Sequence, residues 1–164
     1  EPQLELLLAG LQATAAERLG DRETAREALE ARRSLLDQEY QETEVDELLL
    51  DLAHTCLRLA DVAASERDLA ETQRQLEDGL GYADRHREST GSEVSEVGFR
   101  LLRAYADLHF DGGIPLGSYG RDLEAGLRRY YAFLSEVRNP EWETERIRLE
   151  IYLSLLRLEQ GSGE

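Results

Sequence analysis

Hydrophobic residues return every three or four positions along almost the whole chain. This interval matches the turn of an α-helix and gives each segment one apolar and one polar face. The single-residue alternation that is typical of a β-strand does not occur in the sequence. The pattern therefore predicts an all-α protein, and its interruptions divide the chain into about seven helices.

The first two predicted helices meet at a short turn around Gly20. Asp21 is a good N-cap for the second helix, and Glu23 is favourable in its first turn. Because only a few residues join them, the two helices must run antiparallel. The apolar faces predicted to pack are Leu4, Leu7, Leu8, Leu11, Ala15 and Leu19 in the first helix, and Ala25, Ala28, Leu29, Leu35 and Leu36 in the second.

An acidic, polar connection at 40–44 precedes the third predicted helix, which has the clearest amphipathic pattern. A break at 64–68 leads to the fourth helix. The break holds neither Gly nor Pro, so one long helix is the alternative, and a hairpin is favoured. The predicted core positions are Val45, Leu48, Leu49, Leu52, Cys56, Leu59, Ala60 and Ala63, followed by Leu69, Leu76, Leu80 and Ala83.

Capping and helix-breaking residues in the second half of the chain predict three more helices. Thr90 and Glu93 have the spacing of a capping box at the start of the fifth helix. A Gly-rich loop at 112–118 follows it, and Asn139-Pro140 suits the end of the sixth helix and the start of the seventh. The predicted core positions are Val94, Val97, Leu101, Tyr105 and Leu108, then Tyr119, Leu123, Leu127, Tyr130, Leu134 and Val137.

The seventh predicted helix is apolar almost all round. Such a helix needs burial on more than one side, or it lacks a neighbour. One row is Trp142, Ile147, Ile151 and Leu155, and the other positions are Leu149, Tyr152, Leu153, Leu156 and Leu158.

Helix starts repeat at roughly 45 residues, and several positions resemble the tetratricopeptide repeat family. Leu19-Gly20-Asp21 followed by Ala25 resembles the turn of that family. Other matching residues are Ala125 and Ala132, the repeat-ending Asn139-Pro140, and Leu59, Ala60 and Ala63.

The sequence also departs from this family, since Arg32 replaces a small residue, Arg67-Asp68 replaces Gly-Asp, and the third hairpin has an enlarged loop. The resemblance implies a short α-solenoid of stacked antiparallel hairpins, in one domain over 1–164. It also implies that the first helix of each pair lines a concave binding surface. We therefore expect a protein–protein interaction module and no enzyme.

The net charge of the chain makes some classes of binding partner less favourable than others. The chain has 35 acidic against 19 basic residues, a net charge of -16, and all its basic residues are Arg. This surface repels nucleic acid and anionic lipid, so neither is an expected partner. No apolar run approaches the ~20 residues of a membrane span, and the lone Cys56 cannot form an internal disulfide. We expect a bacterial, cytoplasmic segment of a longer protein, with a flexible tail at 160–164.

Candidate chemistry is sparse. Asp51 and His54 are three apart on one helical face, the spacing used in carboxylate-bridged metal bundles, but a second copy of the motif is missing. A metal or small-ligand bundle is therefore only the alternative function, and no metal or cofactor is expected. The loop at 112–118 lacks the Lys of a phosphate loop. His109 is expected to meet helix-terminal carbonyls rather than Asp111.

Two polar stripes are the predicted partner-binding surface. Arginine forms bidentate hydrogen bonds with carboxylates, so an acidic or C-terminal peptide is the expected ligand. The competing interpretation is a solvated face with an intrahelical ion pair between Arg103 and Asp107. A third alternative is a structural segment that self-associates through the last helix. The predicted site residues are Asp51, His54, Arg58, Arg100, Arg103 and Asp107, with Thr55 beside the first three.

Overall fold

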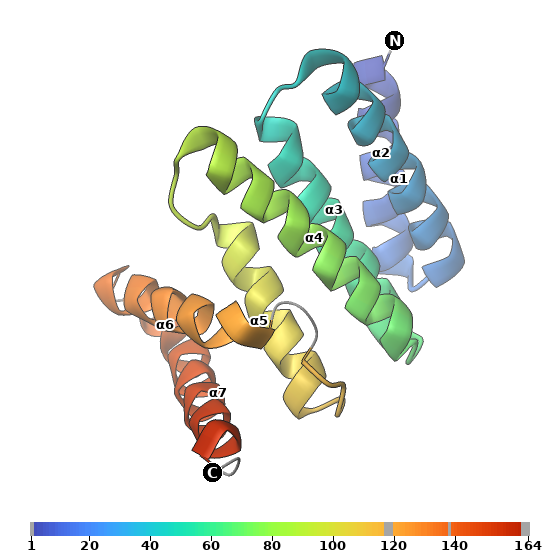
Figure 1. The fold of residues 1–164 in the computed structure, drawn as a ribbon. Coiled ribbons are helices and arrows are strands. Elements are labelled where there is room, and N and C mark those ends of the chain that lie inside the picture. Colours follow the sequence, from blue (N-terminus) through green and yellow to red (C-terminus); the bar gives the residue numbers. More distant parts are fainter. Residues whose placement is uncertain (1, 117–119, 138, 162–164) are drawn as a thin grey trace. The chain divides into compact units, whose positions relative to one another are not determined.

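The computed structural model describes residues 2–116, 120–137 and 139–161, and within these ranges every regular element is helical (Figure 1). The predicted all-α class, built from antiparallel hairpins, is confirmed. Tyr119, the side chain of Val137 and most of the expected tail at 160–164 lie outside the described residues. The helices are α1 (Pro2–Leu19), α2 (Arg22–Thr43), α3 (Glu47–Ser65), α4 (Leu69–Thr90), α5 (Glu96–Phe110), α6 (Gly120–Val137) and α7 (Glu143–Gly161).

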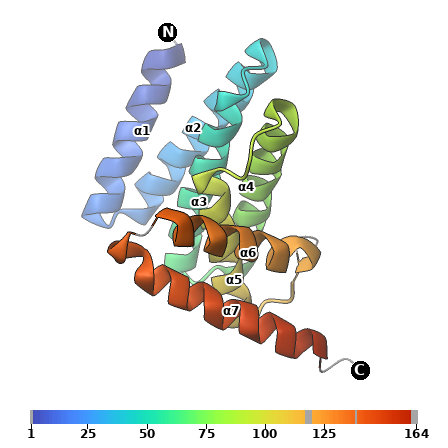
Figure 2. The same cartoon turned by 90° about the vertical axis from the view of Figure 1, so that its left-hand side faces the viewer.

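The chain forms two compact units, Glu1–Leu101 and Leu102–Glu164. In the first unit, α1 packs on α2, α2 on α3 and α3 on α4, so that two antiparallel hairpins stack side by side (Figures 1 and 2). In the second unit, α6 packs on α7. The expectation of one domain over the whole chain stays a prediction.

The two hairpins of the first unit share one turn geometry. Gly20 and Arg67 both have left-handed backbones, with φ of 72° and 62°. The aspartates that follow them, Asp21 and Asp68, each accept a hydrogen bond from the backbone amide three residues later, at 3.1 and 3.0 Å. The break at 64–68 is therefore a true hairpin turn, as favoured, and not part of a single long helix.

The core of the first unit has a small-residue part and a leucine part. At the first, alanines of α1 and α2 meet the end of α3, and at the second, leucines of α2 and α3 meet beneath two tyrosines. The first cluster is Ala13, Ala16, Ala25, Ala28, Leu29, Leu59 and Val62. The second is Leu36, Leu49 and Leu52, covered by Leu6, Tyr40, Leu48 and Tyr82.

The predicted buried face of α1 is wrong. This helix turns its small residues, Ala9, Ala13 and Ala16, toward its neighbours. Alanine allows helix axes to approach closely, and a leucine at these positions would hold α1 further from α2. The leucines therefore face outward: Leu4, Leu7, Leu8, Leu11 and Leu19 are 53, 57, 55, 59 and 84% exposed.

Two predicted helix boundaries need correction. The polar stretch at 40–44 is mostly the last turn of α2, because Tyr40 packs against the core and the helix continues to Thr43. Thr90 ends α4 instead of capping α5. The cap of α5 is Ser95, whose Oγ accepts a hydrogen bond from the amide of Gly98 at 3.2 Å. Two predicted core residues at such boundaries, Val45 and Leu69, are exposed.

In the second unit, α7 is buried on one face and bare on the other. Asn139 caps the short turn that precedes α7, as predicted, through a hydrogen bond to the amide of Glu141. The buried residues are Leu123, Leu127, Tyr130 and Leu134 from α6, and Leu149, Tyr152, Leu153 and Leu156 from α7. On the other face, Ile147, Ile151 and Leu155 are 50, 52 and 36% exposed.

Candidate partner-binding surface

Three arginines from three different helices act electrostatically on one histidine in the first unit. His54 and Arg58 lie one turn apart on α3, Arg32 comes from α2, and Arg100 comes from the first turns of α5. With Asp51, one turn before His54, these residues are called the His54 cluster below. Four of the six predicted site residues therefore belong to the cluster.

The pKa of His54 reflects the charges of the other residues in this cluster. His54 is exposed over more than a third of its surface, and the neighbouring helices shield the rest from water. This loss of hydration lowers the pKa of His54, and the positive charges of Arg100, Arg58 and Arg32 lower it further. Asp51 acts in the opposite direction and is outweighed. At His54 the arginines thus outweigh Asp51, although the net charge of the chain is -16.

Arg58 is already engaged inside the protein. Its Nε and Nη2 donate to the two carboxylate oxygens of Glu17 on α1, at 3.0 and 2.8 Å. Nη2 also donates to the hydroxyl of Thr14, at 3.2 Å. A bidentate pair of this kind fixes the guanidinium plane and joins α3 to α1. Arg58 contributes its charge to the cluster, while its hydrogen-bond donors are largely occupied.

Arg32 and Arg100 have more freedom to bind a ligand. Arg32 has one long contact, 4.0 Å from its Nη2 to Oδ1 of Asp51. Its guanidinium lies over Gly10, where a Cβ would come within 2.5 Å of Nη1. Arg100 is exposed, and no hydrogen bond or ion pair joins its guanidinium to another described residue. In the sequence, Arg32 stands out only because it replaces a small residue of the repeat pattern. The signal for its position is Gly10, whose missing side chain leaves room for the Arg32 guanidinium.

The other two predicted site residues, Arg103 and Asp107, lie in the second unit and form internal contacts. Nε of Arg103 is 3.4 Å from Oδ2 of Asp107 and 3.6 Å from Oε1 of Glu145. Asp107 also accepts a hydrogen bond from the hydroxyl of Tyr152 on α7. Burial of the phenol raises the pKa of Tyr152, and this bond to Asp107 raises it further. The intrahelical pair of Arg103 and Asp107 is present, and the contacts with Glu145 and Tyr152, which the sequence did not indicate, link α5 to α7.

Two further sequence-based expectations have clear outcomes. Thr55 does not join the polar stripe, because it is buried and donates to the carbonyl of Asp51 at 2.8 Å. His109 contacts a backbone carbonyl, but one in the loop after α5 and not one of the helix-terminal carbonyls that were expected. Its Nδ1 donates to the carbonyl of Ile114 at 2.6 Å, and its Nε2 lies 3.1 Å from Glu159.

A hollow of about 440 Å³ adjoins the Arg58 end of the cluster. It lies at the turn between α1 and α2, against the last turns of α3. Its mixed lining could receive a short side chain next to the arginines. The lining residues are Glu17, Gly20, Arg22, Ala25, Arg58, Asp61, Val62 and Ser65.

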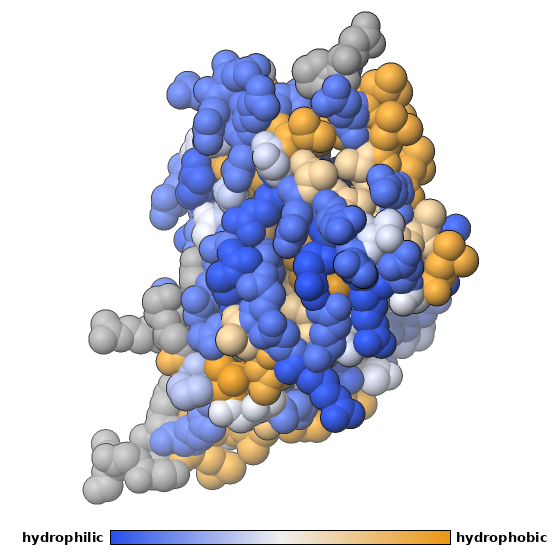
Figure 3. Space-filling model, turned by 90° about the vertical axis from the view of Figure 1, so that its right-hand side faces the viewer, coloured by the Kyte–Doolittle hydropathy of each residue, from blue (hydrophilic) through white to orange (hydrophobic). Residues whose placement is uncertain are grey.

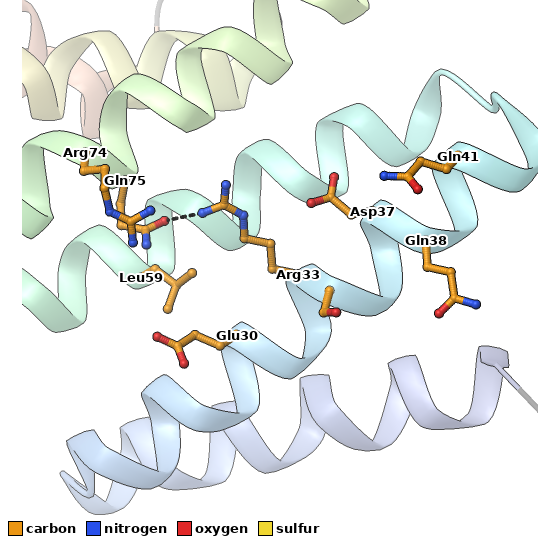
Figure 4. Close-up of a pocket in the computed structure, with 9 residues that line it drawn as sticks. Glu30, Arg33, Asp37, Gln38, Gln41, Leu59, Arg74 and Gln75 are labelled. Atoms are coloured by element: carbon orange, nitrogen blue, oxygen red, sulfur yellow. Dashed lines mark hydrogen bonds between the residues drawn. The ribbon is translucent and has the colours of Figure 1, made fainter.

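A second hollow, of about 510 Å³, lies between α2 and α4 (Figure 4). Figure 4 shows Arg33 and Gln75 pointing toward one another across it, with a hydrogen bond of 3.1 Å between them. Arg33 also donates to Asp78 at 2.8 Å, and Asp37 accepts from the hydroxyl of Tyr82 at 3.0 Å. These polar groups satisfy one another and hold α2 on α4, so we assign this hollow a structural role.

Within the described ranges, no three residues among His, Cys, Asp and Glu gather as a metal site. None of the helices traced there combines the length and apolar character needed to cross a bilayer. Comparison with profiles of known protein families and with curated proteins finds no match. The geometry of the His54 cluster is therefore the main basis for a functional proposal.

Proposed function

We propose that this chain is a docking module that captures a carboxylate-rich segment of a partner protein on the His54 cluster. The observation that carries the proposal is that Arg32, Arg58 and Arg100 all act on His54 with positive charge in a strongly acidic chain. An acidic surface with one positive site repels anions in general but retains a ligand that reaches that site. The proposal includes the tetratricopeptide-like character and the cytoplasmic setting expected from the sequence.

The cluster supports this binding through two free arginines and one fixed one. Arg32 and Arg100 have guanidinium donors with few internal acceptors. Each can form a charge-assisted, bidentate pair with an Asp, a Glu or a terminal carboxylate. Arg58 stays in its pair with Glu17, which offsets its charge, so Arg32 and Arg100 are the residues proposed to bind the carboxylates. We infer that Arg103 and Asp107 take no part.

The alternative of a metal or small-ligand bundle at Asp51 and His54 has less support. A metal ligand must be a deprotonated carboxylate or a neutral imidazole that can approach a cation. Three arginines next to His54 oppose a second cation at the same place. The remaining alternative, self-association through α7, is supported by the bare face of Ile147, Ile151 and Leu155.

Peptide binding measured by fluorescence anisotropy tests the docking proposal. The probe is a labelled peptide with several Glu and Asp residues and a free C-terminus, and its matched control has Gln and Asn instead. We expect the acidic peptide to bind, and Arg32→Ala with Arg100→Ala to weaken binding about tenfold or more, because each loses a charge-assisted pair.

The control for the loss of two positive charges is Arg87→Ala with Arg128→Ala, at two exposed ion pairs outside the cluster. We expect this control to retain the affinity of the parent chain. Equal weakening by both double variants would mean that only net charge matters, and the docking site would then be rejected. Binding of the neutral peptide as tightly as the acidic one would also contradict the proposal.

A further inference from the structure

The outer face of α1 is the largest departure from normal burial in the first unit. Leu4, Leu7, Leu8 and Leu11 are each more than half exposed, while α1 turns alanines inward. Figure 3 faces the side on which α1 and α2 lie and shows hydrophobic residues along its upper right margin. The terminal helix of a hairpin stack usually has a polar outer face that keeps the stack soluble. In α1 the two faces are reversed.

The exposed face also lacks charge. Residues 6–16 hold no acidic or basic side chain, although 33% of the chain is charged. Two copies of a chain with a net charge of -16 repel one another over most of their surface. A contact centred on 6–16 avoids this repulsion at short range, so α1 is suited to meet a second copy.

The spacing on this face is self-complementary. Leu4, Leu8, Leu11 and Ala15 follow one another at intervals of four, three and four, and Ala15 is exposed like the leucines. This series reads the same in both directions about a midpoint between residues 9 and 10. Two copies of α1 placed antiparallel therefore bring Leu8 against Leu11 of the second copy, and Leu4 against its Ala15. In this register Glu5 lies opposite Thr14, so no carboxylate faces another.

We propose that α1 pairs antiparallel with α1 of a second copy of this chain, which makes the protein a two-fold symmetric dimer. Such an interface uses the same patch twice and closes on itself. The antiparallel arrangement also places the opposite ends of the two helix dipoles together.

The area of the patch sets the strength of the dimer. Four leucines exposed to this degree present on the order of 400 Å² per copy, the size at which an apolar patch usually marks an interaction site. Two copies contribute about 800 Å², and the flanking Gln3, Gln12 and Ala15 bring the contact toward the ~1,200 Å² at the lower limit of specific interfaces. The dimer is therefore weak, with a dissociation constant on the order of micromolar.

Sedimentation equilibrium of the 164-residue chain tests the dimer. At about 100 µM we expect a species of twice the 18.6 kDa chain mass, which dissociates on dilution. Leu8→Glu with Leu11→Glu should raise the dissociation constant at least tenfold, because four carboxylates then meet at the interface. Both leucines are exposed, so circular dichroism should show the same helix content in the variant.

Ile151→Glu, on the bare face of α7, is the matched control and should leave the dimer unchanged. A parent chain that stays monomeric at this concentration would overturn the proposal. So would a dimer that tolerates both substitutions in α1 and is lost with Ile151→Glu, since the contact would then lie on α7.

Cross-linking tests the register. A mixture of Leu8→Cys and Leu11→Cys chains, treated with a short bifunctional maleimide, should cross-link more efficiently than either variant alone. The native Cys56 does not interfere, because it is fully buried and burial raises the pKa of its thiol to about 12. Cross-linking of each variant with itself, without gain in the mixture, would indicate a parallel pair and overturn the antiparallel one. The dimer proposal rests on α1 alone and does not require the His54 cluster to be a binding site.

Discussion

At the scale of single residues, the turn at Arg67 shows that the Gly-Asp turn of the first hairpin can form without its glycine. Gly20 and Arg67 occupy equivalent positions and have the same left-handed backbone. Glycine adopts this conformation without penalty, whereas a side chain brings Cβ too close to the following carbonyl. The aspartate that follows determines the cap in both hairpins, so the turn forms at Arg67 in spite of this strain.

Replacing Arg67 with Gly should therefore stabilise the protein. Relief of the left-handed strain is worth about 1 kcal/mol, reduced by the greater freedom that glycine gives the unfolded chain. Urea denaturation followed by circular dichroism measures the change as a higher midpoint with the same slope. The mirror substitution, Gly20→Ala, should lower the midpoint. A lower midpoint for Arg67→Gly would mean that its side chain makes a stabilising contact.

His54 should make docking depend on pH. Its pKa lies below the ordinary 6.5, because partial burial and three arginines disfavour the charged ring, so it is neutral at pH 7. As the pH falls below 6.5 and through that lowered pKa, the ring gains a proton and adds a positive charge to the cluster. The affinity for an acidic peptide should therefore rise with falling pH on the acidic side of 6.5, until the peptide carboxylates begin to protonate.

Anisotropy titrations at a series of pH values check this dependence. His54→Gln keeps a polar side chain of similar size but cannot titrate, so its affinity should stay flat over the same interval. An equal rise in both proteins would assign the effect to another group.

At the scale of helices, the sequence predicted elements better than it predicted faces. The apolar face of α3 was correct because large residues repeat there without an alternative: Leu49, Leu52, Cys56 and Leu59 are all buried. In α1 two faces compete, one of leucines and one of alanines. Hydrophobicity favours the leucines, but close packing against α2 selects the alanines, and a single-sequence pattern does not contain that information.

The candidate site was predictable to a similar degree. The spacing of Asp51, His54 and Arg58 placed them together on α3, and the structure agrees. Arg32 could not be assigned from spacing, because it reaches the site from the adjacent helix. The spacing of Arg103 and Asp107 left two interpretations open, because a helical stripe of charge looks the same whether it faces solvent or forms ion pairs within the protein.

Two helical glycines should respond oppositely to alanine. In both, alanine gains about 1 kcal/mol of helix propensity. At Gly79, however, the new Cβ would lie 2.8 Å from Cδ2 of Leu101 and 3.1 Å from Cβ of Cys56, in a fully buried region. Overpacking there costs about 1–3 kcal/mol, so Gly79→Ala should be destabilising overall.

At Gly10 the obstacle is only the end of the flexible Arg32 side chain, so Gly10→Ala should be stabilising. It should also weaken peptide binding, because Arg32 must move. Thermal denaturation of both variants, with anisotropy for the second, measures these effects. If Gly79→Ala proves the more stable of the two, the contact between α4 and the start of α5 is looser than these distances indicate.

At the scale of the whole molecule, charge works against compactness. A net charge of -16 on 164 residues produces repulsion that folding concentrates into a smaller volume. The internal ion pairs offset part of this repulsion locally. With 35 acidic and 19 basic residues, however, many carboxylates have no basic residue to pair with.

Salt should therefore raise the melting temperature. Raising NaCl from about 20 mM to about 300 mM shortens the screening length to less than the spacing of most surface charges. A gain of about 1 kcal/mol would appear as an increase of about 2–4 °C in a calorimetric scan. Sodium sulfate is unsuitable here because it also strengthens apolar burial. A decrease with NaCl would mean that the ion pairs contribute more to stability than the net charge subtracts.

The polar side-chain contacts that join α1 to α3 and α2 to α4 connect residues at similar separations along the chain. Arg58 meets Glu17 across 41 residues, and Arg33 meets Asp78 across 45. Each contact thus spans about one hairpin repeat and no more. Folding speed depends on how far apart in the chain the partners are that must find one another. Each hairpin of this chain can therefore close soon after it leaves the ribosome and serve as the surface on which the next one forms.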